Sequence, residues 1–315
     1  MKRGWFVVLC ILVFVVSLIG SMVFKLSYKP WAEEYTVEWS DEIGTVHTDL
    51  SYGEEPANRF DLYLPADNTK ETYGLVVYLH AGGFTTGDKA DDREMLQWLC
   101  SKGYVAAGIN YTLRDEAHPD ASVYSQSMEI KASIPAVVAE AERLGYRLDR
   151  MAISGGSAGG TLAMLYAYRA AAEAPIPVKL LFEAVGPSSF HAEDWDVYGL
   201  DRDPEAAAGL FGVMAGVEIS AEMIESGDYQ EAVKPISGYA WANGSSVPTV
   251  IAYGAYDKVC PFKTARHLVH ALEANGVDYA YFELPHSGHA LQNDDTIYKQ
   301  YMDAVCEYLD RYMAS

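Results

Sequence analysis

Cysteine is scarce in this chain of 315 residues, and its four copies do not form the pattern of a disulfide-stabilised protein. Cys10 falls inside an apolar run, which leaves Cys100, Cys260 and Cys306, an odd number at wide spacing. We interpret these three as single buried thiols. The sequence also lacks C-x-x-C, H-E-x-x-H and similar ligand spacings, so we predict neither a metal site nor a bound cofactor.

Positive charge is also in short supply. The chain has 23 Lys and Arg against 44 Asp and Glu, which gives a formal net charge of −21. Such a surface repels phosphate backbones and anionic lipids, which argues against a nucleic-acid partner. It also disfavours polyanionic substrates, although a local basic patch could override this effect. A small neutral substrate fits best.

Internal repeats and low-complexity tracts are absent, and half of the residues are apolar. This composition excludes a disordered chain. The length suits one large single-core domain better than two smaller ones.

One long apolar run is present near the start. Residues 5–24 contain no charged side chain, and as a helix they would span ~30 Å, the thickness of the hydrocarbon core of a bilayer. We therefore expect a membrane anchor in residues 1–28, a linker over 29–45, and a following domain outside the cytoplasm. The alternative is a cleaved signal peptide and a secreted domain, but no convincing A-x-A-like cleavage site precedes Trp31.

Beyond the linker, apolar runs typical of buried strands alternate with helical patterns. Strands are predicted over residues 59–65, 74–80, 104–111, 151–154, 178–185, 248–253 and 279–284. Helices are predicted over residues 91–102, 158–172, 262–275 and 293–313, and another is expected to begin or kink near Pro135. This alternation predicts an α/β fold with a mostly parallel central sheet and helices on both faces. Functional residues of such sheets gather at the carboxyl ends of the strands.

Residues 155–159, GGSAG, match G-x-S-x-G. The motif alone is weak, but it lies between a predicted strand and a predicted helix, as a nucleophile elbow requires. Small neighbours let strand and helix approach each other around Ser157, and the helix N-terminus offers N–H groups to a developing negative charge. The alternative is a plain glycine-rich turn.

A second glycine-rich turn follows the strand that ends near residue 80, with the sequence His80-Ala81-Gly82-Gly83. Glycine lets backbone N–H groups face a ligand without a Cβ in the way. We assign an oxyanion hole to the N–H groups of Gly82, Gly83 and Ala158. The alternative is a turn with a structural role for His80.

A serine hydroxyl needs a base, and the base needs an acid that fixes its tautomer. Asp257 follows the strand over 248–253, and His289 follows the last strand; the order Ser, Asp, His is the one that α/β-hydrolases use. His286 competes with His289 in the same loop, and we interpret it as a supporting residue. Asp294 and Asp295 look like caps of the last helix. Five other histidines have no motif around them and are interpreted as surface or packing residues: His47, His118, His191, His267 and His270.

Several of these segments resemble the acetyl-esterase and lipase branch of the α/β-hydrolase superfamily over roughly residues 45–312: HAGGF (80–84), NY (110–111), GGSAGG (155–160), YGAYDKVCP (253–261) and HSGH (286–289). DLYLP (61–65) and the DKVCP stretch are similar to members that act on acyl or feruloyl groups of carbohydrates. The resemblance implies an α/β-hydrolase domain over residues 46–315, a Ser157–Asp257–His289 triad and a carboxylic-ester substrate. Ala81 departs from the usual first glycine of H-G-G-G, and Cys260 from a common valine.

Residues 187–246 form a longer connection than is usual between two strands. Six large side chains lie within it: Phe190, Trp195, Tyr198, Phe211, Met214 and Trp241. We interpret the segment as a small, partly helical cap that supplies pocket walls, the alternative being that these side chains only pack. The sequence thus predicts a serine esterase for short, acetyl-type esters, with acylated carbohydrates as an expected substrate. An amidase or peptidase with the same triad, or a catalytically silent surface-binding module, are the alternatives.

Overall fold

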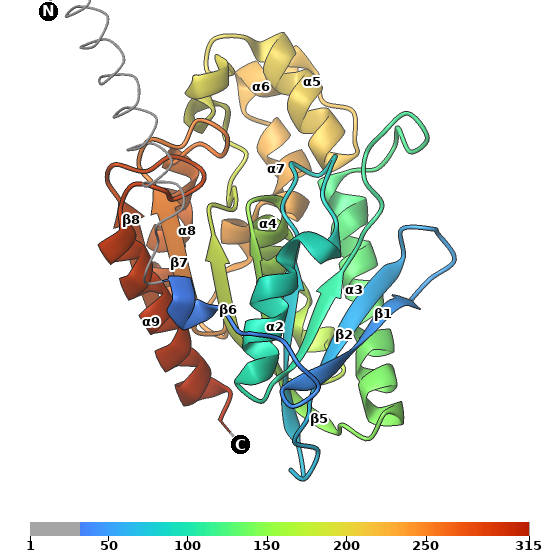
Figure 1. Ribbon diagram of the computed structural model, residues 1–315. Helices are drawn as coiled ribbons and strands as arrows, with labels where there is room; N and C mark the ends of the chain where they lie inside the picture. Colours follow the sequence, from blue (N-terminus) through green and yellow to red (C-terminus); the bar gives the residue numbers. More distant parts are fainter. Residues whose placement is uncertain (1–31, 315) are drawn as a thin grey trace, which may run out of the picture. The chain divides into compact units, whose positions relative to one another are not determined.

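The computed structural model describes residues 32–314 (Figure 1). The chain divides into two units, residues 1–36 and 37–315. The described part of the first unit is a short 3-10 helix, Ala32–Tyr35. The predicted membrane anchor lies outside the described residues. Within residues 32–314, no helix combines the length and the apolar character that crossing a membrane requires.

An eight-stranded sheet forms the centre of the second unit, in the order β1-β2-β4-β3-β5-β6-β7-β8. The pairs β1–β2 and β2–β4 are antiparallel, and all other neighbours are parallel. The mostly parallel sheet is as predicted. The strands are β1 (Gly44–Ser51), β2 (Arg59–Pro65), β3 (Tyr73–Leu79), β4 (Val105–Ile109), β5 (Leu148–Gly156), β6 (Val178–Ala184), β7 (Thr249–Gly254) and β8 (Tyr279–Leu284).

Helices cover both faces of this sheet. α2 and α9 pack on one face, and α3, α4 and α8 pack on the other (Figure 1). The inner strands read as continuous apolar runs because both of their faces are covered. The helices are α2 (Arg93–Ser101), α3 (Val123–Arg143), α4 (Ala158–Leu165), α5 (Pro204–Ala215), α6 (Ala221–Ser226), α7 (Tyr229–Val233), α8 (Lys263–Ala274) and α9 (Asp295–Tyr312).

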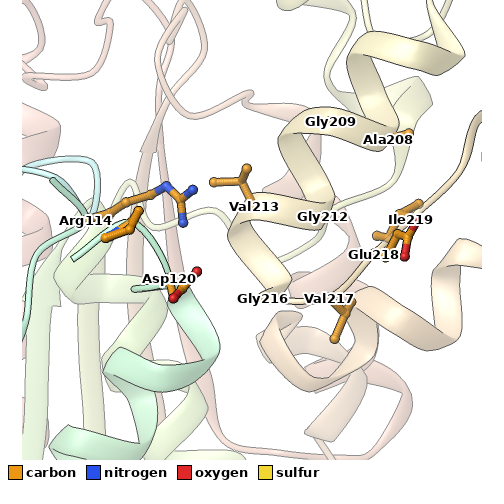
Figure 2. A pocket seen from close by; sticks show the side chains of 11 residues that line it. Arg114, Asp120, Ala208, Gly209, Gly212, Val213, Gly216, Val217, Glu218 and Ile219 are labelled. Atoms are coloured by element: carbon orange, nitrogen blue, oxygen red, sulfur yellow. The ribbon is translucent and has the colours of Figure 1, made fainter. Parts of the chain in front are cut away.

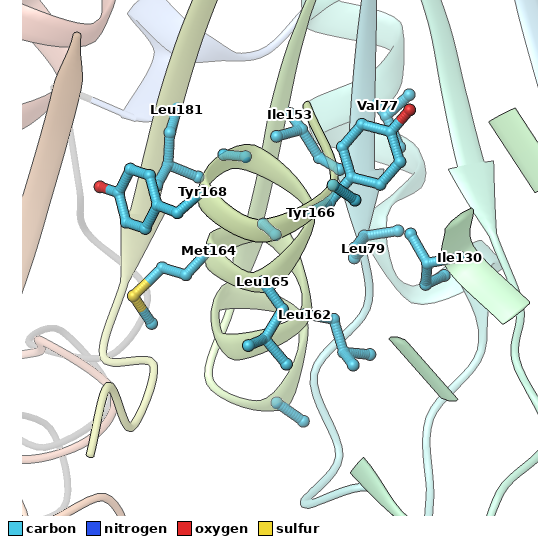
Figure 3. Close-up of a cluster of buried hydrophobic side chains, with 14 of the residues drawn as sticks. Val77, Leu79, Ile130, Ile153, Leu162, Met164, Leu165, Tyr166, Tyr168 and Leu181 are labelled. Carbon is cyan, nitrogen blue, oxygen red and sulfur yellow. The ribbon is translucent and has the colours of Figure 1, made fainter. Parts of the chain in front are cut away.

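α4 is the most deeply buried helix, and it begins directly after Ser157. All eight of its residues are buried. Figure 3 shows Leu162 and Leu165 of α4 among side chains of β3, β5 and α3, including Leu79 and Ile130. A helix that is apolar on every side is stable only when it is surrounded by protein. Tight packing around α4 therefore fixes the position of the residue at its N-terminus.

Three local predictions differ from the structure. α3 runs through Pro135 and begins at Val123, where Ser122 and Ser125 form a reciprocal capping box. The helix predicted over 158–172 changes after Leu165 into a π turn and a 3-10 turn. The edge strand β1 was not predicted, because most of its side chains are exposed and show no apolar alternation.

The long segment between β6 and β7 contains α5, α6, α7 and several 3-10 turns. These helices gather at one end of the sheet (Figure 1). Three of its aromatic side chains pack against one another: the ring centroids of Phe190 and Trp195 are 5.5 Å apart, and those of Trp195 and Phe211 are 5.8 Å apart. Phe190 and Phe211 are fully buried, so these two residues serve packing.

Candidate active site

Ser157 lies in the sharp turn between β5 and α4. Its φ of 53° and ψ of −120° place a non-glycine residue in a strained region of backbone space. The turn is possible because its neighbours have no side chains: a Cβ on Gly159 would lie 1.9 Å from the Leu79 carbonyl oxygen, and a Cβ on Gly155 would lie 2.5 Å from the Gly159 backbone. The glycines of the motif are therefore a steric requirement of the elbow.

The structure brings the three predicted triad residues together. His289 Nε2 lies 2.9 Å from Ser157 Oγ, and His289 Nδ1 lies 2.7 Å from Asp257 Oδ2. When Nδ1 donates its proton to the carboxylate, Nε2 carries the lone pair that can accept a proton from the serine hydroxyl. The side chains form one continuous chain of hydrogen bonds from Asp257 to Ser157.

Both carboxylate oxygens of Asp257 accept hydrogen bonds. While Oδ2 accepts from His289, Oδ1 accepts from the backbone N–H groups of Val259 and Cys260 at 2.8 and 2.9 Å. The carboxylate is fully buried. Because buried polar groups are costly unless they are paired, this complete set of donors keeps the side chain in a single orientation.

Asp294 stabilises the loop that carries His289. This role differs from the prediction that Asp294 caps the last helix. Asp294 stands at the start of α9, but its side chain makes no capping hydrogen bond. Instead its carboxylate accepts from His286 N, His286 Nδ1 and Ser287 Oγ, at 2.9, 2.8 and 2.6 Å. Burial alone would raise the pKa of Asp294, but these hydrogen bonds outweigh it and lower the pKa. His286 itself is largely exposed, and it supports the loop.

Replacing Asp294 with alanine is expected to lower kcat/KM by about 10- to 100-fold, because His289 would lose its fixed position. The measurement is steady-state ester hydrolysis together with a melting curve that verifies folding. Asp295→Ala, the adjacent exposed carboxylate in α9, is the matched control and should leave kcat/KM unchanged. Equal kinetics for the two variants would show that Asp294 does not position the loop.

The glycine-rich turn after β3 lies beside Ser157. Gly82 and Gly83 have φ values of 129° and 59°, and a Cβ on Gly82 would lie 1.9 Å from the Thr86 carbonyl oxygen. His80 is buried and stacks on Tyr111, with ring centroids 4.3 Å apart. Burial lowers the pKa of His80. This stacked, neutral imidazole fixes the base of the turn.

Of the three predicted oxyanion residues, Gly83 and Ala158 line the cavity next to Ser157, and Gly82 does not. The Gly82 carbonyl accepts from the N–H groups of Thr85 and Thr86, and these two hydrogen bonds close the turn. In the described part of the chain, the N–H groups of Gly83 and Ala158, like that of Gly82, have no protein acceptor. Two unpaired donors beside a serine hydroxyl are suited to bind a negatively charged oxygen.

An apolar cavity of about 180 Å³ adjoins Ser157. Its lining comes from the two turns, the segment after β6 and the loop after Asp257: Gly83, Phe84, Ser157, Ala158, Pro187, Trp195, Tyr198, Leu210, Met214, Val259 and Cys260. The sequence predicted only part of this set. Leu210 carries no motif, and its role depends on how α5 packs.

Cys260 is one of these wall residues. Its Sγ lies 3.8 Å from Ser157 Oγ, and burial raises the pKa of its thiol. The protonated thiol therefore serves as a small apolar wall. The cysteines within residues 32–314 form no disulfide; Cys100 is buried and Cys306 is partly buried.

The segment of residues 194–198, which carries Trp195 and Tyr198, is fastened to the chain that follows Asp257. Three contacts make this connection: Tyr198 Oη to Val259 O at 2.8 Å, Lys263 Nζ to Asp196 at 2.7 Å, and His267 Nε2 to Asp194 at 2.7 Å. The hydrogen bond with Asp194 raises the pKa of His267. His267 is thus an ion-pair residue, which its sequence context did not indicate.

A larger groove of about 530 Å³ lies elsewhere, between the loop after β4 and α5 (Figure 2). Figure 2 shows Arg114 and Val213 facing each other across it. Gly209, Gly212 and Val213 line the groove, whereas Leu210 and Met214 line the cavity beside Ser157. Given 3.6 residues per turn, these two sets lie on different sides of α5. The groove contains no pair of a nucleophile and a base.

Over the described range, 32–314, no three His, Cys, Asp or Glu side chains are arranged so that they could hold a metal ion. The chemistry that this geometry supports is nucleophilic attack by Ser157, with His289 as the base.

Comparison with known proteins identifies the fold. The BD-FAE family model matches residues 60–272. Among solved structures, a truncated carbohydrate esterase from gut microbiota is similar with a TM-score of 0.67 at 19% identity, over 86% of this chain and 98% of that one. Esterase B from Lactobacillus rhamnosis has a TM-score of 0.63 at 21% identity, over 94% of this chain and 98% of that one. These likenesses show an α/β-hydrolase fold.

A curated esterase is also similar to this chain in sequence. Esterase LipC from Mycobacterium tuberculosis is 24% identical over 245 residues, which cover 76% of this chain and 58% of LipC. The chain thus spans little more than half the length of that relative.

Proposed function

The chain belongs to the BD-FAE family, and on this premise we propose that it hydrolyses carboxylic esters through an acyl-enzyme formed on Ser157. The observation that carries the proposal is the hydrogen-bonded chain from Asp257 through His289 to Ser157, at 2.7 and 2.9 Å, next to two unpaired backbone donors. These are the parts that acyl transfer requires: an activated nucleophile, an oriented base and a site for the oxyanion.

Each residue has one role in the proposed reaction. Ser157 Oγ forms a bond to the acyl carbon while its proton passes to His289 Nε2. The N–H groups of Gly83 and Ala158 stabilise the negative oxygen of the tetrahedral intermediate, each donor contributing about 3 kcal/mol. His289 then gives its proton to the leaving alcohol. Water attacks the acyl-enzyme in the same way, and Asp257 stays ionised and holds the imidazole in place.

The cavity beside Ser157 suits the acyl group. It is small and lined mainly by apolar side chains, and each methylene that it buries contributes about 0.8 kcal/mol. Trp195, Leu210 and Met214 are among its apolar walls. We therefore propose a preference for short acyl groups, from acetyl to butyryl.

The rim of the site suits a ring-shaped alcohol. Tyr198 is 49% exposed and Val259 is 50% exposed, and both line the cavity. Tyr256, which is 67% exposed, directly precedes Asp257 and donates its N–H to Ser287 O in the His289 loop. Exposed tyrosine rings can pack against the apolar face of a sugar and bond its hydroxyls. We propose an acylated carbohydrate as the substrate, in line with the carbohydrate esterase of similar fold.

The test is hydrolysis of p-nitrophenyl esters from C2 to C12 and of acetylated xylo-oligosaccharides by the full chain. Activity that peaks between C2 and C4 and includes the acetylated sugar supports the proposal. A folded protein that cleaves none of these esters would contradict it.

Met214 provides a sharper test of the acyl cavity. Truncation to alanine should enlarge the cavity and move the preferred chain from C2–C4 towards C6–C8, with kcat/KM for the C8 ester rising about tenfold. Val213→Ala is the matched control, since Val213 is adjacent on α5 and faces the outer groove. An unchanged chain-length profile in Met214→Ala would show that the acyl group binds elsewhere.

A further inference from the structure

A buried carboxyl group lies close to the nucleophile elbow and takes no part in the proposed reaction. Glu183, near the end of β6, is fully buried. Its Oε2 accepts from the Gly186 N–H at 2.9 Å, and its Oε1 has no partner in the described part of the chain. Buried polar atoms without hydrogen-bond partners are rare because they reduce the stability of the fold. The presence of a carboxyl group at this position therefore calls for an explanation.

Glu183 lies close both to the elbow and to the turn that follows β6. A Cβ on Gly160 of α4 would lie 2.7 Å from Glu183 Oε2, and a Cβ on Gly186 would lie 2.9 Å from the same atom. In the sheet, Glu183 is aligned with Gly155 of β5. Its neighbour Ala184 accepts the Ser157 N–H at 2.8 Å. The carboxyl group therefore contacts both structures that shape the site.

The turn over residues 185–187 needs such support. Val185 has a φ of 53°, which is unfavourable for a β-branched residue. Gly186 is held at its N–H by Glu183 and at its carbonyl by Tyr253 Oη, while the Pro187 carbonyl accepts from Thr161 Oγ1 at 2.8 Å. Pro187 lines the cavity beside Ser157. Any loosening of this turn would thus move a wall of the substrate cavity.

The surroundings of Glu183 favour its neutral form. Within residues 32–314, no Lys, Arg or His side chain is within ion-pair distance of it. Burial raises the pKa of Glu183 to about 8, and the hydrogen bond from the Gly186 N–H and the nearby Tyr253 hydroxyl offset only part of this effect. The titratable groups that face it from the surrounding elements all have a pKa raised by burial and are neutral as well: Tyr78 of β3, Tyr168 after α4, Tyr253 of β7, Cys260 and Tyr301 of α9.

We propose that Glu183 is a positioning residue, whose neutral carboxyl group holds the Val185–Pro187 turn against the nucleophile elbow and so keeps the cavity wall in place. The inference rests on the proposed function, because its readout is ester hydrolysis. Ionisation of Glu183 would place an unpaired charge beneath the elbow. Hydrolysis should therefore decline at alkaline pH, as the carboxyl group loses its proton.

The experiment compares Glu183→Gln and Glu183→Met in the full chain. Glutamine keeps the acceptor for the Gly186 N–H and cannot ionise, so kcat/KM at pH 6.5 should stay within about threefold of the wild type. Methionine has a similar length but no such acceptor, and kcat/KM should fall about 10- to 100-fold. The decline of kcat/KM above pH 8 should appear in the wild type and be absent in Glu183→Gln.

The matched control is Asp92→Asn. Burial also raises the pKa of Asp92, to about 7, but this residue does not line the cavity, so its replacement should keep the alkaline decline. Melting curves at each pH separate loss of activity from unfolding. An alkaline decline in Glu183→Gln equal to that of the wild type, or normal kinetics in a folded Glu183→Met, would overturn the inference. Absence of ester hydrolysis by the wild type would overturn the proposed function as well, so the two failures are distinguishable.

Discussion

Replacing Ser157 with alanine is expected to lower kcat by a factor of roughly 10⁴ to 10⁶, with little change in KM. The cavity and the two unpaired N–H donors remain in this variant, so substrate still binds, but no acyl-enzyme can form. The measurement is p-nitrophenyl acetate hydrolysis, together with covalent labelling by a fluorophosphonate, which should disappear.

Ser154→Ala is the control for this substitution. Ser154 is buried in β5, three residues before the nucleophile, and its Oγ has no hydrogen-bond partner in the described part of the chain. Its removal should change neither turnover nor labelling. If Ser157→Ala kept more than one hundredth of the wild-type turnover, Ser157 could not be the nucleophile.

Replacing Asp257 with asparagine should cost roughly 10⁴ in kcat while the fold remains intact. An amide can donate to His289 Nδ1, which would favour the tautomer whose Nε2 carries the proton. That nitrogen could then no longer take the proton from Ser157. The loss should be seen in steady-state kinetics and in the rate of fluorophosphonate labelling.

Asp278→Asn is the matched substitution for Asp257→Asn. Asp278 accepts hydrogen bonds from Tyr308 and Tyr312 of α9, so it too is a bonded carboxylate, but it does not line the cavity beside Ser157. This variant is expected to be somewhat less stable and fully active. If the two variants had similar kcat values, the role of Asp257 as the acid of the triad would be refuted.

Much of the fold could be predicted because its central strands are buried on both faces. β2 and the edge strand β8 also have the predicted bounds, residues 59–65 and 279–284. β2 shows alternation and ends at Pro65, and β8 is mostly apolar and aromatic. The resemblance to α/β-hydrolase esterases is confirmed by the family match over residues 60–272.

Features that depend on long-range packing could not be predicted. α3 begins at Val123, and its first turns are mostly polar, so an apolar pattern reveals only its second half. Pro135 costs the helix one backbone hydrogen bond, and packing of the helix on the sheet compensates for that loss. The role of Asp294 was misjudged because a carboxylate at a helix start usually caps that helix, whereas this one bonds a loop eight residues earlier.

In the candidate site, too, the triad could be predicted from the sequence and the cavity walls mostly could not. Ser157, Asp257 and His289 each follow the carboxyl end of a strand in the parallel part of the sheet, so the order of elements alone predicted that they lie close together. The cavity walls come from the segment between β6 and β7, whose position no local pattern encodes. Of the six large residues predicted there, Trp195, Tyr198 and Met214 line the cavity. The anchor over residues 5–24 and the extracytoplasmic placement stay predictions.

The segment between β6 and β7 has a further consequence for how such enzymes diversify. It leaves the sheet after Ala184 and returns at Thr249, so it is one uninterrupted stretch of sequence, and none of the three triad residues lies within it. Insertions, deletions or recombination confined to the part of this stretch beyond Pro187 can therefore create new pocket shapes without displacing the three triad residues. Related enzymes with this architecture can therefore evolve new substrate preferences while they keep the same catalytic mechanism.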